Sequence, residues 1–181
     1  VLIFMLFLAM NACECMAQEI QQASGTIQIT DMLGRQLTVP ENISSVISTS
    51  PPSTILVYML APDKLAGWNF INNFNHTLMD ENYQSLPVIG GWYGTQTGNY
   101  ETMINMSPDI VIEGYTTDGE VQETINRRQE KFGSIPVVAI DGSIIFVTKS
   151  DPTIEYVGKL LDCKDQAEKL LEFRSSILTK I

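Results

Sequence analysis

The chain has 181 residues, 44% of them hydrophobic and 18% charged, a composition that can bury a core and argues against disorder. Its 11 Lys and Arg against 21 Asp and Glu give a formal net charge of −10, which disfavours binding to a nucleic-acid backbone. One histidine and three cysteines disfavour a histidine-rich zinc site and a disulfide scaffold.

The first ten residues, VLIFMLFLAM, are apolar and uncharged, too short to span a bilayer as a helix but typical of a signal-peptide core. We expect residues 1–17 to be a signal peptide truncated at its start, with Cys15 and Ala17 at the small-residue positions. Lipid attachment at Cys13 or Cys15 is one alternative, and a buried N-terminal helix is another. Residues 18–25 are polar and are expected to form a tether. The chain end lies within a helical pattern, so we expect a fragment at both ends.

Apolar and polar residues alternate over residues 26–30 and 36–39, which predicts a β-hairpin. Short apolar runs and helical patterns then follow in turn. The predicted strands are 46–49, 64–68, 87–89, 109–113 and 136–140. The predicted helices run from Ser53 or Thr54 to Leu60, from Asn99 to Met106, from Asp118 to Phe132, and from Asp151 to the end. Residues 69–86 are expected to form a long loop.

This order predicts an α/β fold, with a hairpin followed by a mainly parallel sheet that carries helices on both faces. Residues 26–150 are expected to form one α/β lobe, and residues 151–181 a helical region. Ligands on such sheets bind at the carboxyl ends of the strands. The residues expected at those ends are 50–52, 68–70, 90–94, 113–115 and 141–142.

Motifs for serine hydrolases, P-loop nucleotide binding and HExxH zinc proteases are absent from the sequence. Glu113 and Asp141 end neighbouring predicted strands, as a general acid and base would, but no nucleophile accompanies them and solvated acids are the favoured interpretation. The glycine-rich segment 90–94 does not match a dinucleotide-binding loop. His76 lies in the long loop, where a solvated side chain is favoured.

Eight of the 15 aromatic residues lie between residues 68 and 115. Several of them stand where the chain leaves a predicted strand, which is the mouth of a ligand site. Aromatic side chains at such a mouth suit a flat or partly apolar ligand. Ordinary packing under the long loop is the alternative.

Five segments, in order, resemble motifs of the substrate-binding proteins of metal-chelate ABC importers, the iron–siderophore, haem and cobalamin binding proteins. They are residues 29–40 (ITDMLGRQLTVP), 46–54 (VISTSPPST), 63–67 (DKLAG), 87–91 (PVIGG) and 99–112 (NYETMINMSPDIVI). The arginine that usually opens the second motif and the glutamate that usually closes it are missing here. The resemblance implies two α/β lobes joined by a long, stiff helix that starts near Leu161, with the ligand between the lobes and the second lobe missing from this chain.

The resemblance also implies an exported binding protein, periplasmic or at the cell surface, that captures an iron or cobalt chelate and delivers it to an ABC permease with its ATPase. It implies no catalytic residue, cofactor or protein metal ligand, because the metal arrives inside its chelator. Membrane association is expected through a lipid anchor or permease docking. A sensory ectodomain of a signalling receptor is the alternative, and an enzyme that uses Glu113 and Asp141 is a further one.

Site residues carry over from the family by position. The implied ligand-binding residues are Ser50, Pro51, Ser53, Thr54, Trp68, Asn69, Phe70, Trp92, Tyr93 and Tyr115. Glu101 occupies the position of a glutamate that pairs with permease arginines in this family. It falls in the first turn of a helix that Asn99 can cap, where a negative charge is favoured; helix-end stabilisation is the alternative role.

Overall fold

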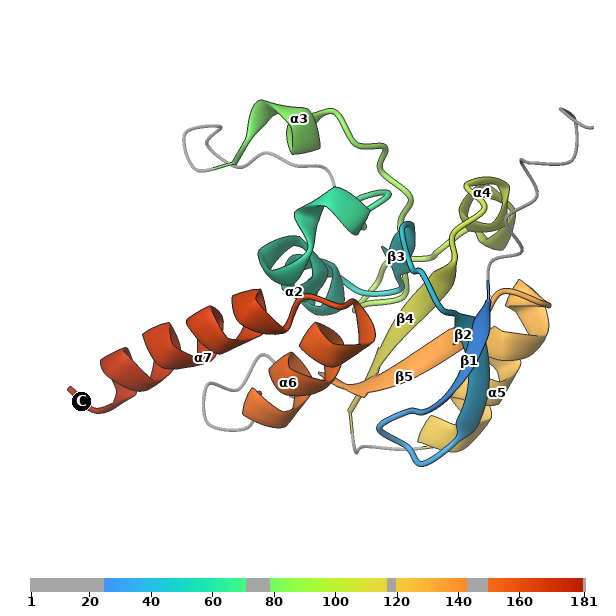
Figure 1. Cartoon of the computed structure of the whole chain (residues 1–181). Helices are drawn as coiled ribbons and strands as arrows, with labels where there is room; N and C mark the ends of the chain where they lie inside the picture. Colours follow the sequence, from blue (N-terminus) through green and yellow to red (C-terminus); the bar gives the residue numbers. More distant parts are fainter. Residues whose placement is uncertain (1–24, 71–78, 117–119, 143–149, 181) are drawn as a thin grey trace, which may run out of the picture.

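The computed structural model describes residues 25–70, 79–116, 120–142 and 150–180 (Figure 1). The expected signal peptide, most of the tether, and His76 lie outside the described residues. Within the described part of the chain, no helix is both long enough and apolar enough to cross a membrane.

The predicted hairpin is present as β1 (Thr26–Thr30) and β2 (Gln36–Pro40), paired antiparallel. Asp31, which follows β1, has a buried carboxylate that forms an ion pair with Arg35 at 2.7 Å. Arg35 also donates a hydrogen bond to the Val137 carbonyl at 2.6 Å, so the turn is attached to the edge of the main sheet.

The main sheet is parallel, with the order β3-β4-β5, and consists of β3 (Val46–Ser48), β4 (Ile110–Tyr115) and β5 (Val137–Asp141). Side chains alternate between the two faces of each strand. Helices α2 (Pro51–Leu60) and α6 (Asp151–Leu160) cover one face and share a core with Val46, Ile112 and Val138. Helices α4 (Tyr100–Asn105) and α5 (Val121–Phe132) cover the other face, over Ile47, Val111 and Val137. The predicted α/β fold with helices on both faces is therefore confirmed.

Two predicted strands differ from the expectation. Segments 64–68 and 87–89 pair only through single parallel bridges, Val46–Leu65 and Trp68–Val88. The turn of 3-10 helix η1 (Pro62–Lys64) runs up to Leu65, and Pro87 has no amide hydrogen to donate, so neither segment continues as a ladder.

Helix boundaries also differ in places. The helix α2 begins at Pro51 with Ser50 at its N-cap, so Ser53 and Thr54 lie inside it rather than capping it. The expected loop 69–86 contains a short helix, α3 (Glu81–Gln84). The expected cap of α5, Asp118, lies outside the described residues.

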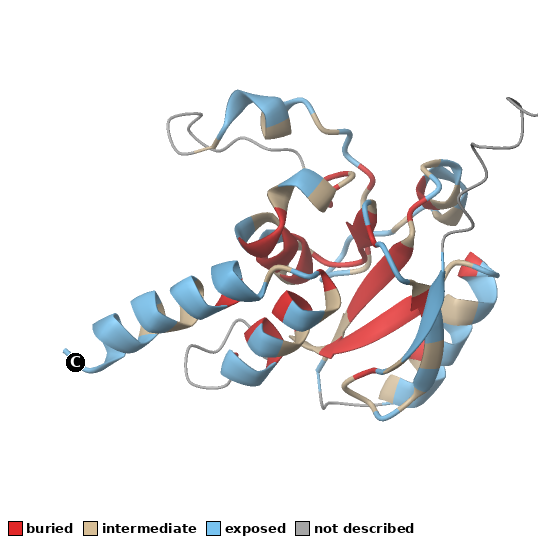
Figure 2. Cartoon of the chain, in the orientation of Figure 1, coloured by how far each residue is buried: buried red, intermediate tan, exposed pale blue. Residues whose placement is uncertain are grey.

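The C-terminal helical region is broken into α6 and α7 (Lys164–Leu178), with Asp162 at the break in the left-handed conformation (φ 53°). The two helices approach closely at Gly158, where a Cβ would lie 2.5 Å from the Ala167 Cβ. Figure 1 shows α7 passing α2 and then extending away from the sheet, and Figure 2 shows that most of its surface is exposed.

Candidate ligand-binding groove

A groove of about 410 Å³ lies between α2 and α7. It is at the carboxyl end of the sheet, because α2 follows β3 directly and the Thr153 hydroxyl of α6 donates to the Asp141 carbonyl at the end of β5. The lining residues are Pro51, Pro52, Ile55, Leu56, Met59, Tyr93, Ser150, Ile154, Leu170, Phe173 and Arg174. Pro51 and Tyr93 are thus two sequence-implied ligand residues that the structure brings together.

Most of this lining is apolar and much of it faces solvent. The exposed fractions are 62% for Phe173, 48% for Tyr93, 42% for Met59 and 39% for Ile55. Contiguous exposed apolar surface marks binding sites for ligands or partners. Phe173, Ile55 and Met59 were not predicted from the sequence as ligand residues. The i, i+4 spacing of Ile55 and Met59 does indicate that these two side chains share one face of a helix.

Two polar groups interrupt the apolar lining. Ser150 is 1% exposed, and its hydroxyl has no hydrogen-bond partner among the described residues. Arg174 lies at the rim in an ion pair with Asp151, at 2.7 Å. The groove therefore offers little polar surface to a ligand, because the Ser150 hydroxyl is buried and the Arg174 charge is compensated by Asp151.

Ser50 and Ser53 face each other near the start of α2, with their hydroxyl oxygens 3.1 Å apart. The hydroxyl of Ser53 packs against Gly114 of β4, where a Cβ would lie 2.4 Å from it. Both serines are buried. In this structure the two hydroxyl groups bond to each other, and their contact with a ligand stays a prediction.

Thr54 and Asn69 join the end of β3 to the loop that precedes α4. The Thr54 hydroxyl donates to the Asn69 side-chain oxygen, and the Asn69 amide donates to the carbonyls of Ser48 at 2.7 Å and Gly90 at 2.6 Å. Both side chains are buried. These contacts give the two residues a structural role in holding that loop.

Trp68 lies in the core rather than at the expected mouth position, with 1% of its surface exposed. Its indole N–H donates to the Tyr83 carbonyl at 2.8 Å, and its ring centroid is 5.3 Å from that of Tyr58 and 5.9 Å from that of Phe70. Trp68 pairs with Val88 in an isolated parallel bridge, and its ring packs against Tyr58 of α2.

Trp92 and Tyr115 are both half-buried, and each has a partner within the protein. The Trp92 ring lies under the guanidinium group of Arg128, 3.7 Å from ring centroid to guanidinium carbon. The Tyr115 hydroxyl donates to the Met32 carbonyl at 3.1 Å, and burial together with nearby Asp141 raises the pKa of Tyr115. Neither residue lines the groove.

Glu113, which was considered with Asp141 as a catalytic pair, is not the solvated acid that was expected. The Glu113 carboxylate is buried and lies 3.2 Å from Arg128 Nε. Burial raises the pKa of Glu113, against the attraction of Arg128. Its partner is thus a structural cation on α5, which favours a role in the fold over one in catalysis.

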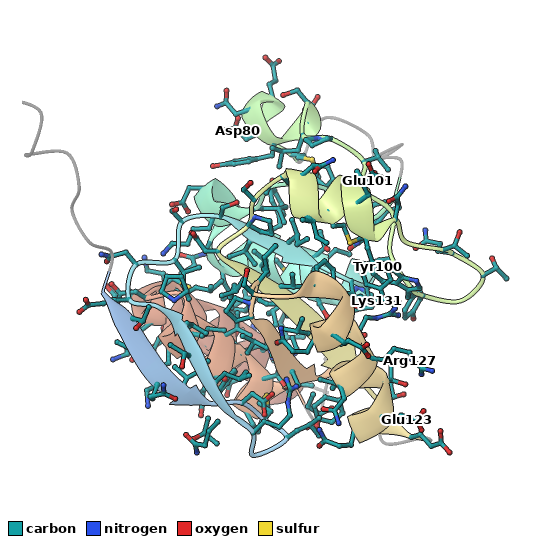
Figure 3. The ribbon with its side chains drawn as sticks, turned by 90° about the vertical axis from the view of Figure 1, so that its right-hand side faces the viewer. Asp80, Tyr100, Glu101, Glu123, Arg127 and Lys131 are labelled. Atoms are coloured by element: carbon teal, nitrogen blue, oxygen red, sulfur yellow. The ribbon has the colours of Figure 1, made fainter. Side chains whose placement is uncertain are left out.

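Glu101 is exposed in the first turn of α4, on the outer side of that helix (Figure 3). The predicted cap is confirmed, because the Asn99 side-chain oxygen accepts a hydrogen bond from the Thr102 amide at 3.2 Å. The carboxylate is therefore positioned near a helix N-terminus and accessible to a partner.

No protein-family model and no curated protein matches the chain. Solved structures do match. An ABC transporter solute-binding protein from Sulfurospirillum deleyianum DSM 6946 aligns with a TM-score of 0.67 and 21% identity, over 79% of this chain and 44% of that one. The molybdate-binding protein MolA of a Haemophilus influenzae ABC transporter aligns with a TM-score of 0.55 and 20% identity, over 81% and 49%. The haem-binding protein HmuT aligns with a TM-score of 0.57 and 17% identity, over 82% and 44%.

The chain therefore has about half of the fold of TroA-like periplasmic solute-binding proteins, as the sequence motifs implied. It spans less than half of the length of the three proteins compared above. The first two are named as binding proteins of ABC transporters, and the third as a haem-binding protein.

Proposed function

We propose that this chain is the N-terminal lobe and the start of the interlobe helix of a substrate-binding protein that serves an ABC importer. The fold that it shares with solute-binding proteins is the observation that carries the proposal. The groove at the carboxyl end of the sheet supports it, because α/β sheets bind ligands at that end. A periplasmic or cell-surface location and delivery of the ligand to a permease with its ATPase follow from the same proposal.

The ligand that fits this groove best is a metal chelate with a large apolar face, such as haem or cobalamin. An apolar lining whose arginine is already paired with Asp151 suits a bulky, mostly apolar molecule. It suits a small oxyanion such as molybdate less well, because an oxyanion is usually held by several hydrogen-bond donors or uncompensated cations.

The groove is tested with Phe173→Ala in the full-length protein, titrated in turn with haem, cobalamin and a ferric siderophore by absorbance. Burying a large apolar side chain against a ligand contributes about 1.5–3 kcal/mol, so we expect affinity to fall roughly 10-fold or more. Stability should change little, because Phe173 is 62% exposed.

Val88→Ala is the matched control, since Val88 is 50% exposed and lies outside the groove. It should bind the chelate as the unmodified protein does. Equal affinities for the Phe173 and Val88 variants would place the ligand elsewhere.

Docking to the permease is tested at Glu101. An exposed carboxylate that pairs with a permease arginine steers association and is sensitive to salt. We expect Glu101→Ala to keep ligand affinity but reduce stimulation of the importer ATPase in reconstituted vesicles, and Glu101→Arg to reduce it further through repulsion.

Glu155→Arg serves as the control, because Glu155 is also exposed but lies on α6, which covers the other face of the sheet. Its effect on ATPase stimulation should be small. Full stimulation by the Glu101→Arg protein would leave Glu101 as a helix-end charge.

A further inference from the structure

Arg128 of α5 connects three parts of the molecule. Its Nε lies 3.2 Å from the Glu113 carboxylate on β4, and its Nη1 donates to the Tyr100 hydroxyl at 2.5 Å, at the start of α4. Its guanidinium carbon lies 3.7 Å from the centroid of the Trp92 ring. One planar cation thus contacts a strand, a helix and a loop at the same time.

Trp92 belongs to the loop that carries Tyr93 into the groove. Its amide donates to the Thr49 carbonyl at 2.7 Å, which fixes the loop to the end of β3. Its ring covers Gly98, where a Cβ would lie 2.7 Å from the nearest ring atoms. The ring is therefore closely packed, and the contact with Arg128 holds the loop at its middle.

Tyr100 precedes the proposed docking residue Glu101 in the sequence, just as Trp92 precedes the groove residue Tyr93. Its ring centroid lies 4.5 Å from that of Trp92 and 5.1 Å from that of Phe132. The helix α4 has six residues, and so short a helix depends on tertiary contacts for its position. The Tyr100–Arg128 hydrogen bond is one of those contacts.

We propose that Arg128 is a positioning residue that sets, through Trp92 and Tyr100, the placement of both the groove residue Tyr93 and the docking residue Glu101. The functional roles of Tyr93 and Glu101 rest on the proposed function. A guanidinium group suits this task because it stacks on an aromatic face while it donates hydrogen bonds in its own plane, which an ammonium group cannot do. The buried Glu113 carboxylate holds the guanidinium group in that orientation.

The test variant is Arg128→Lys, which keeps a positive charge near Glu113 but loses the planar face. Amide hydrogen exchange in the full-length protein is measured at Trp92, at Met103 in α4, and at Val111 in the sheet as a reference. The Met103 amide donates to the Asn99 carbonyl at 3.2 Å, and the Val111 amide donates to the Pro136 carbonyl at 2.9 Å. We expect exchange at Trp92 and Met103 to be roughly five-fold faster, the size of effect that loss of one cation–π contact produces, and exchange at Val111 to be unchanged.

Arg127→Lys is the matched control on the same helix. Arg127 is exposed and points outward from α5 (Figure 3), with a long 3.4 Å hydrogen bond to Thr124. It should leave exchange unchanged at all three amides. The positioning role is overturned by unchanged exchange at Trp92 in the Arg128→Lys protein, and equally by acceleration at Val111 to the same degree, which would mean a general loss of stability.

Function supplies the second readout. Two quantities are measured: the affinity for whichever of haem, cobalamin and a ferric siderophore binds the unmodified protein, and the stimulation of the importer ATPase. Arg128→Lys should lower both several-fold, whereas Phe173→Ala lowers the affinity alone and Glu101→Arg lowers the stimulation alone. If Arg128→Lys leaves both at the unmodified level while the other two variants lose theirs, the positioning inference fails and the proposed function stands. If Phe173→Ala and Glu101→Arg retain full function, the groove and docking assignments of the proposed function fail, and the inference that Arg128 positions functional residues fails with them.

Discussion

Replacing Trp68 with alanine is expected to lower the free energy of unfolding by about 3–5 kcal/mol, the usual cost of removing a large aromatic side chain from a core. Trp68 is 1% exposed and packs on Tyr58 of α2 and on Phe70. Alanine would leave a cavity there and would leave the Tyr83 carbonyl without its indole donor. Urea denaturation followed by far-UV circular dichroism measures the loss.

Tyr93→Ala is the comparison, because Tyr93 is an aromatic residue of the same region that is 48% exposed. Its effect should stay within about 0.5 kcal/mol, as for most surface substitutions. The two variants therefore separate a core aromatic from a groove aromatic. If Trp68→Ala lowers the free energy of unfolding by less than about 1 kcal/mol, Trp68 is not a core residue, and the position at the mouth of the ligand site that the sequence predicted is favoured instead.

The alternation of strands and helices was predictable because it depends on local patterns. Strand β3 begins with the β-branched residues Val46 and Ile47, and strand β5 begins with the apolar run 137–140, as is typical of buried strands. Asn99 caps α4 as expected, because capping needs one side chain and its neighbouring amides. The segment 87–89 has the apolar pattern of a strand, but Pro87 has no amide hydrogen to donate. This segment therefore pairs with Trp68 through a single bridge instead of forming a strand of the sheet.

The groove was less predictable, because it forms where α7 turns back beside α2. That packing depends on the break at Asp162 and on the close approach at Gly158, which a continuous helical pattern does not reveal. Of the implied ligand residues, Pro51 and Tyr93 line the groove. Others, such as Asn69, sit at the right strand ends but turn inward to bond the backbone. Sequence position gives the strand end, whereas side-chain direction depends on the tertiary contacts.

The role of Arg128 also depends on tertiary contacts that the sequence does not reveal. In the sequence Arg128 is one of two adjacent arginines in a polar helix, and its spacing of three residues from Ile125 and four from Phe132 places it on the apolar face of that helix. Helical geometry places neighbouring residues about 100° apart around the axis, so one arginine faces the sheet while the other faces solvent. Recognition of the role of Arg128 requires the positions of Glu113 and Trp92 across the helix–sheet interface, which sequence spacing does not give.

Asp31→Asn is expected to cost about 3–5 kcal/mol, the range for removing one partner of a buried ion pair. The Asp31 side chain is 0% exposed, and Arg35 is its ionic partner. The carboxylate also accepts hydrogen bonds from the turn amide of Arg35 at 2.9 Å and from the Ala139 amide at 3.2 Å. Asparagine has a similar size, but its side-chain NH2 group is a hydrogen-bond donor and would face the donors that now bond to the carboxylate. The hairpin should therefore be held less firmly against β5.

A double-mutant cycle with Arg35→Met measures how much of this cost belongs to the pair. Arg35 also donates to the Val137 carbonyl, so Arg35→Met alone should be destabilising as well. If the ion pair holds the turn, the double variant should be more stable than the sum of the single effects predicts, by roughly 0.5–3 kcal/mol. Additive losses in the cycle would instead mean that the Asp31 carboxylate acts through the hydrogen bonds that it accepts from the backbone amides of Arg35 and Ala139. The ion pair with Arg35 would then contribute little to the attachment of the hairpin to the sheet.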